Sequence, residues 1–277
     1  MNIVVLIKAN SPQIWFVNSV HKQHPVSLVV VEKNNIRNGF KERIKNLDFF
    51  GLIQGAKNIF LNHRKIKKSS KAADNILGED SKKINNSIPI IFVDDINDAV
   101  VLKKLHRLSP DIILDHGTSL VKDDILGTAN LSLNLHWGLS PYYRGGPSTE
   151  WALLAHDLNN IGVTIHSLDK SIDGGDVYGQ ARILVAKNDT LASINVKLTK
   201  AGTNIVIDAL NRIAVGQELN FAKQDFSKGI LISSKMLTPD LKRKLSIIEN
   251  NGFEVILKSK ELHPMQPIVK ANSATFL

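Results

Sequence analysis

The stretch LSLNLHWGLSPYYRGGPSTEWALLAHDLNNIGVTIHSLDKSIDGGD, residues 131–176, holds the most informative pattern in the chain. It begins with an apolar strand-like run that contains Asn134 and His136, and a loop rich in Gly and Pro follows. A helix and a second strand come next, and the stretch ends in a turn-forming Asp-Gly-Gly sequence that begins at Asp173. Each of the three polar side chains therefore lies at a strand end or in the loop after one, where open α/β sheets bind ligands.

The three residue types suit the transfer of an acyl group to an amine. Asn134 and His136 are two residues apart in a strand, so both side chains point to one face. An amide and an imidazolium can stabilise an oxyanion, an imidazole can move a proton near neutral pH, and a carboxylate can orient it and favour its charged form. Alone, His136 suits a buried core, Asp173 a turn and Asn134 a strand end. Together they favour catalysis.

Four sequence elements in order resemble the folate-dependent formyltransferases. They are Asn-x-His at 134–136, the Pro and Arg-Gly loop at 139–145, the strand GVTIH at 162–166 and the loop IDGGD at 172–176. The family includes glycinamide ribonucleotide, methionyl-tRNA and sugar N-formyltransferases, and a weaker resemblance runs from Met1 to about Gly216. It implies a Rossmann-like α/β fold with a mostly parallel sheet, and transfer of a formyl group from 10-formyltetrahydrofolate to a primary amine. The catalytic residues that it implies are Asn134, His136 and Asp173.

The resemblance also implies two folate-binding loops and a few substrate contacts. His166 is expected to pack in the core, with a place beside Asp173 as the alternative. Asp115 and His116 are adjacent, but two ligands without a third are a weak metal site, so no metal is expected. The expected folate-binding residues are Gly117, Thr118, Ser119, Leu120, Val121, Asp169, Ile172 and Gly174. The expected substrate-binding residues are Asn10, Ser11 and Arg144, and anchoring of its own loop is the equally weighted alternative for Arg144.

The order of elements predicts one catalytic domain and a short extension. Buried strands alternate with helices through the first part of the chain, which indicates a parallel sheet. Residues 1–216 form the expected domain, with a basic insertion at about 33–87, and 217–277 form a small C-terminal extension. The expected strands are 3–7, 26–31, 88–93, 112–114, 131–136, 162–168, 177–185 and a pair near 224–233. The expected helices are 14–24, 40–60, 96–108, 148–156, 190–214 and 239–250.

Composition narrows the class of protein. The 277 residues include 43% hydrophobic residues and no Cys, which indicates a globular protein without disulfides or thiolate catalysis. No apolar run is long enough for a membrane helix and the N-terminus does not resemble a signal peptide, so a cytoplasmic protein is expected. Residues 32–83 hold 13 Lys or Arg against 6 Asp or Glu, within a net charge of +9. This region is either a solvated helical excursion or a patch for a polyanion such as nucleic acid.

The acceptor amine follows only by elimination. Residues 217–277 are too few for the complete C-terminal barrel domain of methionyl-tRNA formyltransferase. The first loop, after Ile7, lacks the Gly-rich phosphate cradle expected of the glycinamide ribonucleotide enzyme. An amino sugar carried on a nucleotide is therefore the first hypothesis. A methionyl-tRNA formyltransferase-like enzyme is the second. A nucleic-acid-binding protein on a degenerate formyltransferase scaffold is the third, and the intact Asn, His and Asp set argues against it. The oligomeric state is left open.

Overall fold

A computed structural model describes residues 1–33, 69–251, 253 and 263–270 of the chain. The predicted helix at 40–60 lies outside these residues, as does most of the predicted basic insertion. Residues 69–77 form a helix, and its residues Ala73 and Leu77 pack with Trp15 and Val196. In the part of the chain that is described, no helix is long and apolar enough to cross a membrane.

A seven-stranded sheet forms the centre of the molecule, and its strand order is β3-β2-β1-β4-β5-β7-β8. The first five strands in this order are parallel, whereas β7 is antiparallel to β5 and β8 is antiparallel to β7. The prediction of a mostly parallel α/β sheet is thus confirmed. The strands are β1 Ile3–Ile7, β2 Val26–Glu32, β3 Ile90–Val93, β4 Ile112–His116, β5 Leu131–His136, β7 Gly162–Ser167 and β8 Val177–Arg182.

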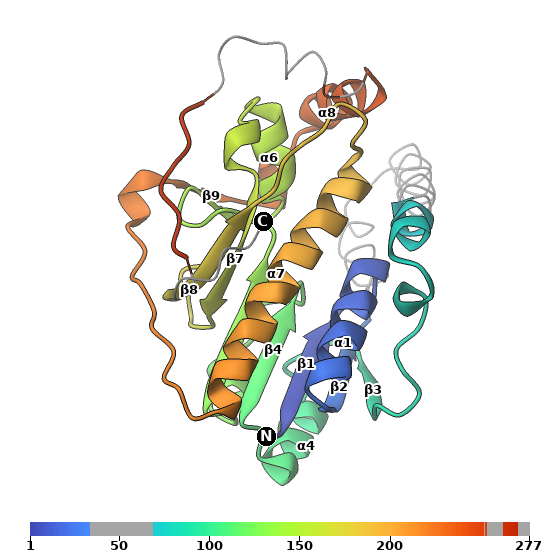
Figure 1. The fold of residues 1–277 in the computed structure, drawn as a ribbon, viewed down its shortest axis with the longest axis vertical. Coiled ribbons are helices and arrows are strands. Elements are labelled where there is room, and N and C mark those ends of the chain that lie inside the picture. Colours follow the sequence, from blue (N-terminus) through green and yellow to red (C-terminus); the bar gives the residue numbers. More distant parts are fainter. Residues whose placement is uncertain (34–68, 252, 254–262, 271–277) are drawn as a thin grey trace, which may run out of the picture.

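Helices cover both faces of the sheet because its strands are apolar on both sides. Successive residues of β1 point to opposite faces, so Val5 and Leu6 belong to two different hydrophobic cores. On the first face α1 Ser11–Gln23 and α7 Leu191–Ala214 lie side by side (Figure 1). On the second face lie α4 Ala99–Leu108 and the single-turn α5 Asp123–Leu126, which the sequence did not predict.

Two element boundaries differ from the prediction in ways that matter for the site. Helix α1 begins at Ser11 rather than Ile14, because Asn10 and Gln13 form a capping box and Pro12 occupies the first turn. Strand β4 continues through His116, although residues 115 and 116 were expected in a loop. Asp115 pairs with Leu6 of β1 and with Asn134 of β5, so neighbouring strands on both sides extend the ladder.

The C-terminal residues contact the main fold through backbone pairing as well as through side chains. The predicted strand pair near 224–233 is wrong, because one short strand, β9 Ile230–Ile232, pairs in parallel with β6 Tyr143–Gly145. Residues 263–270 run beside the edge strand β8, where the Gln180 backbone N–H donates to the Val269 carbonyl at 2.8 Å. The remaining helices are α6 Ser148–Leu154 and α8 Pro239–Asn251. Short 3₁₀ turns are η1 Glu79–Ser81, η2 Leu158–Asn160, η3 Phe226–Lys228 and η4 Ser234–Met236.

Candidate active site

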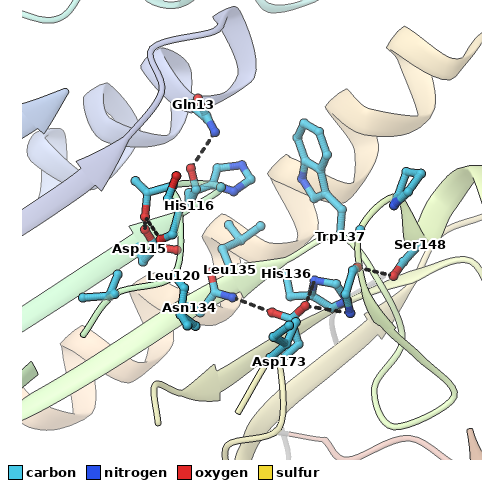
Figure 2. Close-up of a pocket in the computed structure, with 18 of the residues that line it drawn as sticks. Gln13, Asp115, His116, Leu120, Asn134, Leu135, His136, Trp137, Ser148 and Asp173 are labelled. Atoms are coloured by element: carbon cyan, nitrogen blue, oxygen red, sulfur yellow. Dashed lines mark hydrogen bonds and ion pairs between the residues drawn. The ribbon is translucent and has the colours of Figure 1, made fainter. Parts of the chain in front are cut away.

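The structure brings together the three residues predicted to be catalytic. Asn134 and His136 lie at the carboxyl end of β5 on one face, and Asp173 lies in the loop that follows β7 (Figure 2). The Asn134 Nδ2 donates to Asp173 Oδ1 at 3.0 Å, and His136 Nδ1 is 3.2 Å from Asp173 Oδ2. One carboxylate therefore contacts both the amide and the imidazole.

Asp173 is held by donors on both of its oxygens. The Gly145 backbone N–H donates to Oδ2 at 2.8 Å and Asn134 Nδ2 donates to Oδ1, while His166 Nε2 lies 3.4 Å from Oδ1. Burial alone would raise the pKa of Asp173, but the nearby His136 and His166 rings and the Gly145 amide outweigh it, and this pKa lies well below its usual range. Asp173 adopts φ 47°, and a Gln224 side-chain N–H fixes its backbone carbonyl at 3.0 Å. The carboxylate is therefore ionised and fixed in place.

His136 lies between two hydrogen-bond acceptors. Its Nδ1 faces Asp173 and its Nε2 is 3.0 Å from the Tyr143 carbonyl. Burial lowers the pKa of His136, although the charge on Asp173 partly opposes this shift. A neutral ring carries one proton and satisfies only one of these acceptors, whereas an imidazolium satisfies both. The free site thus holds a neutral imidazole in surroundings arranged for a second proton.

A glycine keeps the imidazole in this position. A Cβ at Gly138 would lie 2.1 Å from His136 Nε2 and 2.6 Å from the Tyr143 carbonyl oxygen. Any other side chain at 138 would displace the ring or the loop that contacts it. The glycine at position 138 thus has a direct steric cause.

His166 is a fourth member of the cluster, which the sequence favoured as a packed core residue. It pairs with Asn134 across β5 and β7, and its Nε2 is 3.2 Å from Asn134 Nδ2. Its Nδ1 is 2.7 Å from the Ser167 carbonyl, so this nitrogen carries the proton and Nε2 accepts. Both Asn134 Nδ2 hydrogens are engaged, and Asn134 Oδ1 has no partner among the described residues. Donation from Asn134 to a substrate oxygen thus requires Nδ2 to exchange one of these contacts.

A cavity of about 510 Å³ lies beside the cluster at the carboxyl ends of β4 and β5. Its lining includes the three predicted catalytic residues and the whole predicted loop from Gly117 to Val121. Leu120 and Ile172, on opposite loops, also line it and are 56% and 50% exposed. Two apolar side chains exposed at a cavity are available to a ring-bearing ligand.

Other predicted binding residues are divided between the cavity and its surroundings. Asn10 lines the cavity, whereas Ser11 is buried and its hydroxyl donates to the Ser70 carbonyl at 3.4 Å. The Arg144 guanidinium lies 3.9 Å from the centre of the Phe226 ring and does not line the cavity. Two further predicted folate contacts, Asp169 and Gly174, are also absent from its lining, and Asp169 instead accepts hydrogen bonds from Ser171.

Polar groups on the opposite face of the sheet also reach the cavity. His116 follows Asp115 in β4 and so points to the face covered by α1 and α7, as does Trp137 one residue beyond His136. His116 is 3% exposed, and its ring is 5.0 Å from that of Trp137 and edge-on to it. The sequence pattern indicated His116 only as a weak metal ligand and gave no signal for Trp137. The described residues contain no group of three or more His, Cys, Asp or Glu that could hold a metal ion.

Two buried ionisable groups in β4 have strongly shifted pKa values. Burial lowers the pKa of His116 to about 3, so its ring is neutral. Burial also raises the pKa of Asp115 to about 7, because the Thr118 hydroxyl and backbone amide only partly compensate for lost hydration. Asp115 lines the cavity on the same face of the sheet as Asn134. This side of the cavity therefore gains a negative charge when Asp115 ionises near neutral pH.

Comparisons with known proteins point to one family. Residues 80–210 match the formyl transferase family. Methionyl-tRNA formyltransferase from Limosilactobacillus fermentum is 27% identical over 168 residues, which cover 60% of this chain and 51% of that protein. The chain therefore spans about half the length of this relative.

Solved structures with the same fold include two bacterial formyltransferases. A 4-N formyltransferase from Francisella tularensis has 18% identity and a TM-score of 0.53, covering 84% of this chain and 77% of that one. An N-formyltransferase from Helicobacter canadensis, in complex with folinic acid and dTDP-3-aminofucose, has 18% identity and a TM-score of 0.54, covering 86% of this chain and 72% of that one.

Proposed function

We propose that this chain, whose residues 80–210 belong to the formyl transferase family, transfers a formyl group from 10-formyltetrahydrofolate to a primary amine. The observation that carries the proposal is the contact of one ionised carboxylate, Asp173, with both Asn134 and His136 at the edge of a cavity. These are the groups that an amine needs when it attacks a formyl carbon: donors for the oxygen that becomes negative, and a base for the proton that leaves.

The cavity suits a reduced folate as the formyl donor. The loop Gly117–Val121 and Ile172 offer backbone groups and two exposed apolar side chains to a pterin ring. The bound donor would supply the formyl group, and the protein would supply its position and the surrounding charge. Asp169 and Gly174, which do not line the cavity, would act only by shaping the loop that carries Ile172.

His136 and Asp173 would move the proton in this reaction. The amine attacks as a neutral group, and the proton that it releases passes to His136, whose neutral form is favoured by burial. The resulting imidazolium is stabilised by Asp173 and by the Tyr143 carbonyl, at 3.2 and 3.0 Å from the two ring nitrogens. It would return this proton to N10 of the folate as the bond between N10 and the formyl carbon breaks, which releases tetrahydrofolate and the formylated amine. Asn134 would exchange its His166 contact for the formyl oxygen while it keeps its bond to Asp173. This sequence differs from simple donation by a His136 that is already protonated.

An amino sugar carried on a nucleotide is the proposed acceptor. The support is the absence of the Gly-rich phosphate cradle in the first loop and the shared fold with the Helicobacter protein bound to dTDP-3-aminofucose. A methionyl-tRNA acceptor has the support of the Limosilactobacillus relative, whose aligned region is half of that protein. Each acceptor is therefore tested directly.

The test is a screen of candidate amines with 10-formyltetrahydrofolate, in which release of tetrahydrofolate is measured. dTDP-3-aminofucose, glycinamide ribonucleotide and methionyl-tRNA represent three acceptor classes, and His136→Ala is the inactive control. Calorimetry with 5-formyltetrahydrofolate, a stable analogue, measures donor binding independently. A folded protein that does not bind this analogue at millimolar concentration would remove the donor assignment.

A further inference from the structure

The face of the cavity covered by α1 and α7 holds three side chains that each carry a buried polar atom without a hydrogen-bond partner among the described residues, and we name these three, His116, Trp137 and Asn195, the polar wall. They come from the end of β4, the residue after β5 and the first half of α7, and all three line the cavity. Among the described residues, neither His116 ring nitrogen, nor Trp137 Nε1, nor Asn195 Oδ1 has a hydrogen-bond partner. The Leu135 backbone lies close enough to oppose the lowering of the His116 pKa by burial, but it does not reach hydrogen-bond geometry with either ring nitrogen.

Buried polar atoms without partners are unfavourable, so their grouping at one cavity needs a cause. Each such atom destabilises the fold when no partner replaces the hydrogen bond that it made to water. His116 is fixed between the edges of two rings, since its centroid is 5.6 Å from Phe16 and 5.0 Å from Trp137. The ring is thus held by packing rather than by hydrogen bonds, so the hydrogen-bonding capacity of its two nitrogens is unused.

The hydrogen-bond types of the wall match hydroxyl groups. Trp137 Nε1 is a donor only and Asn195 Oδ1 an acceptor only, whereas the neutral His116 ring has one donor and one acceptor. A hydroxyl donates and accepts, so a ring with neighbouring hydroxyls can satisfy all of these atoms. A phosphate or carboxylate group only accepts and would leave Asn195 Oδ1 and one His116 nitrogen unpaired.

The charges around the cavity also disfavour an anion inside it. Among the described residues, its lining includes Asp115, Glu150 and Asp173 but neither Lys nor Arg. The nearby Lys8 ammonium is 3.5 Å from the carboxylate of buried Glu32, which offsets its charge. An amine-bearing neutral ring is compatible with this lining, whereas a phosphate group is repelled by it.

We propose that His116, Trp137 and Asn195 determine acceptor specificity by hydrogen-bonding the uncharged hydroxyl groups of the acceptor's amine-bearing ring, while any phosphate of the acceptor stays outside the cavity. The proposal rests on the formyl transfer proposed above and assigns residues to its acceptor. The catalytic cluster lies on one face of the sheet edge and the polar wall on the other, so the reacting amine would lie between them.

Calorimetry with two probes tests this assignment on the full chain. dTDP-3-aminofucose carries the ring, and dTDP lacks it. His116→Phe and Trp137→Phe keep aromatic packing but remove the ring nitrogens, so each should weaken dTDP-3-aminofucose binding roughly fivefold to tenfold, the loss of one or two neutral hydrogen bonds. Binding of dTDP and of 5-formyltetrahydrofolate should change less than about twofold, because these lack the hydroxylated ring at the wall.

Trp151→Phe is the matched control. Trp151 Nε1 is also buried without a partner among the described residues, but Trp151 does not line the cavity. It should leave binding of both probes unchanged. If His116→Phe or Trp137→Phe does not fold, as judged by circular dichroism, Asn195→Ala takes its place.

Three results would overturn the proposal. The first is unchanged dTDP-3-aminofucose binding in the folded variants of the polar wall. This result would be clearest if His116→Phe also raised the melting temperature, because the unpaired nitrogens of His116 would then only destabilise the fold. The second is an equal loss in Trp151→Phe. The third is no binding of dTDP-3-aminofucose by the parent protein. Formyl transfer to another amine of the screen would then show that the activity stands and only the ring assignment fails.

Discussion

The polar groups on the two faces of the sheet edge differ in whether they have hydrogen-bond partners. On the face of Asn134 and His136, Asp173 contacts donors from β5 and β6 and lies beside His166 of β7, and its pKa is lowered. On the face of α1 and α7, the polar wall has no internal partners among the described residues. Burial is similar at the centre of each cluster, since His136 is 8% exposed and His116 3%. The difference therefore lies in pairing.

Paired and unpaired polar groups suit two different roles at a binding cavity. Groups that stabilise a developing charge must be oriented before the substrate arrives, because reorganisation during the reaction would raise the barrier. Groups that recognise a substrate gain most when the ligand supplies the missing hydrogen bonds. The cluster around Asp173 has the first property and the polar wall has the second.

The largest expected effect comes from removing the proposed catalytic groups. Asn134→Ala deletes the proposed oxyanion donor and should lower turnover roughly a hundredfold to a thousandfold. His136→Ala deletes the proposed proton carrier and should lower turnover at least as much. Tetrahydrofolate release with a working acceptor measures both, after circular dichroism confirms folding. A folded His136→Ala protein that retains turnover within fivefold of the parent would contradict the proposed mechanism.

A smaller loss is expected when the imidazole is displaced rather than removed. Gly138→Ala places a Cβ 2.1 Å from His136 Nε2, so the ring must shift and turnover should fall roughly a hundredfold. Gly146→Ala is the matched control, because its Cβ meets no atom within 4 Å although Gly146 also lines the cavity. Equal turnover in the two variants would mean that the position of His136 is not critical.

The two carboxyls should respond to pH in opposite directions. Asp115 has a raised pKa, so between about pH 4 and pH 7 the folded state keeps a proton that the unfolded state has lost, and the contribution of Asp115 to stability falls as pH rises. Asp173 has a lowered pKa, so its stabilisation is present above about pH 4 and is lost as pH falls through the folded-state value.

Urea unfolding of two isosteric variants measures this contrast. At pH 8, Asp115→Asn should raise the free energy of unfolding by about 2 kcal/mol, half of the ~4 kcal/mol that a pKa rise to about 7 represents, because relaxation around the charge recovers part. At pH 5 the gain should shrink. Asp173→Asn should lower the free energy of unfolding at pH 8. A destabilised Asp115→Asn protein at pH 8 would contradict the assigned pKa.

The smallest effect is expected from the basic insertion. Neutralising Lys65, Lys67, Lys68 and Lys71 together should leave turnover of a small amine nearly unchanged, because no proposed catalytic group lies there; the first three are outside the described residues. Turnover at low and high salt is the measurement. A large rise in the acceptor KM, strongest at low salt, would instead indicate that the insertion recruits a polyanion.

The fold was largely predictable because its signals are local. Continuous apolar runs such as Ile3–Ile7 mark strands buried on both faces, and helical periodicity marked α7 almost to its ends. The register of neighbouring strands is not local, so the extension of β4 through His116 escaped prediction. The parallel pairing of β9 with β6 was not predicted either. These strands are separated by more than eighty residues, and each strand is only three residues long, which is too short to show a sequence pattern.

The site was predictable where residue spacing fixes direction. Parity in β5 placed Asn134 and His136 together, and the turn sequence located Asp173. Parity also assigns His116 and Trp137 to the other face, but only once the end of β4 is known. The partner of Arg144 could not be foreseen, because Phe226 comes from the C-terminal residues and reaches it through tertiary packing.

The pairing of β6 with β9 makes the proposed chemistry depend on the C-terminal part of the chain. Gly145 pairs with Ile232, adopts φ 79° and would place a Cβ 2.1 Å from the Ile232 carbonyl oxygen, while its N–H holds Asp173 at 2.8 Å. The extension and the reaction centre therefore share a backbone contact. In a chimera, exchanging the residues after 216 for those of another formyltransferase would also exchange the strand that fixes this amide, so the extension cannot be treated as an interchangeable module.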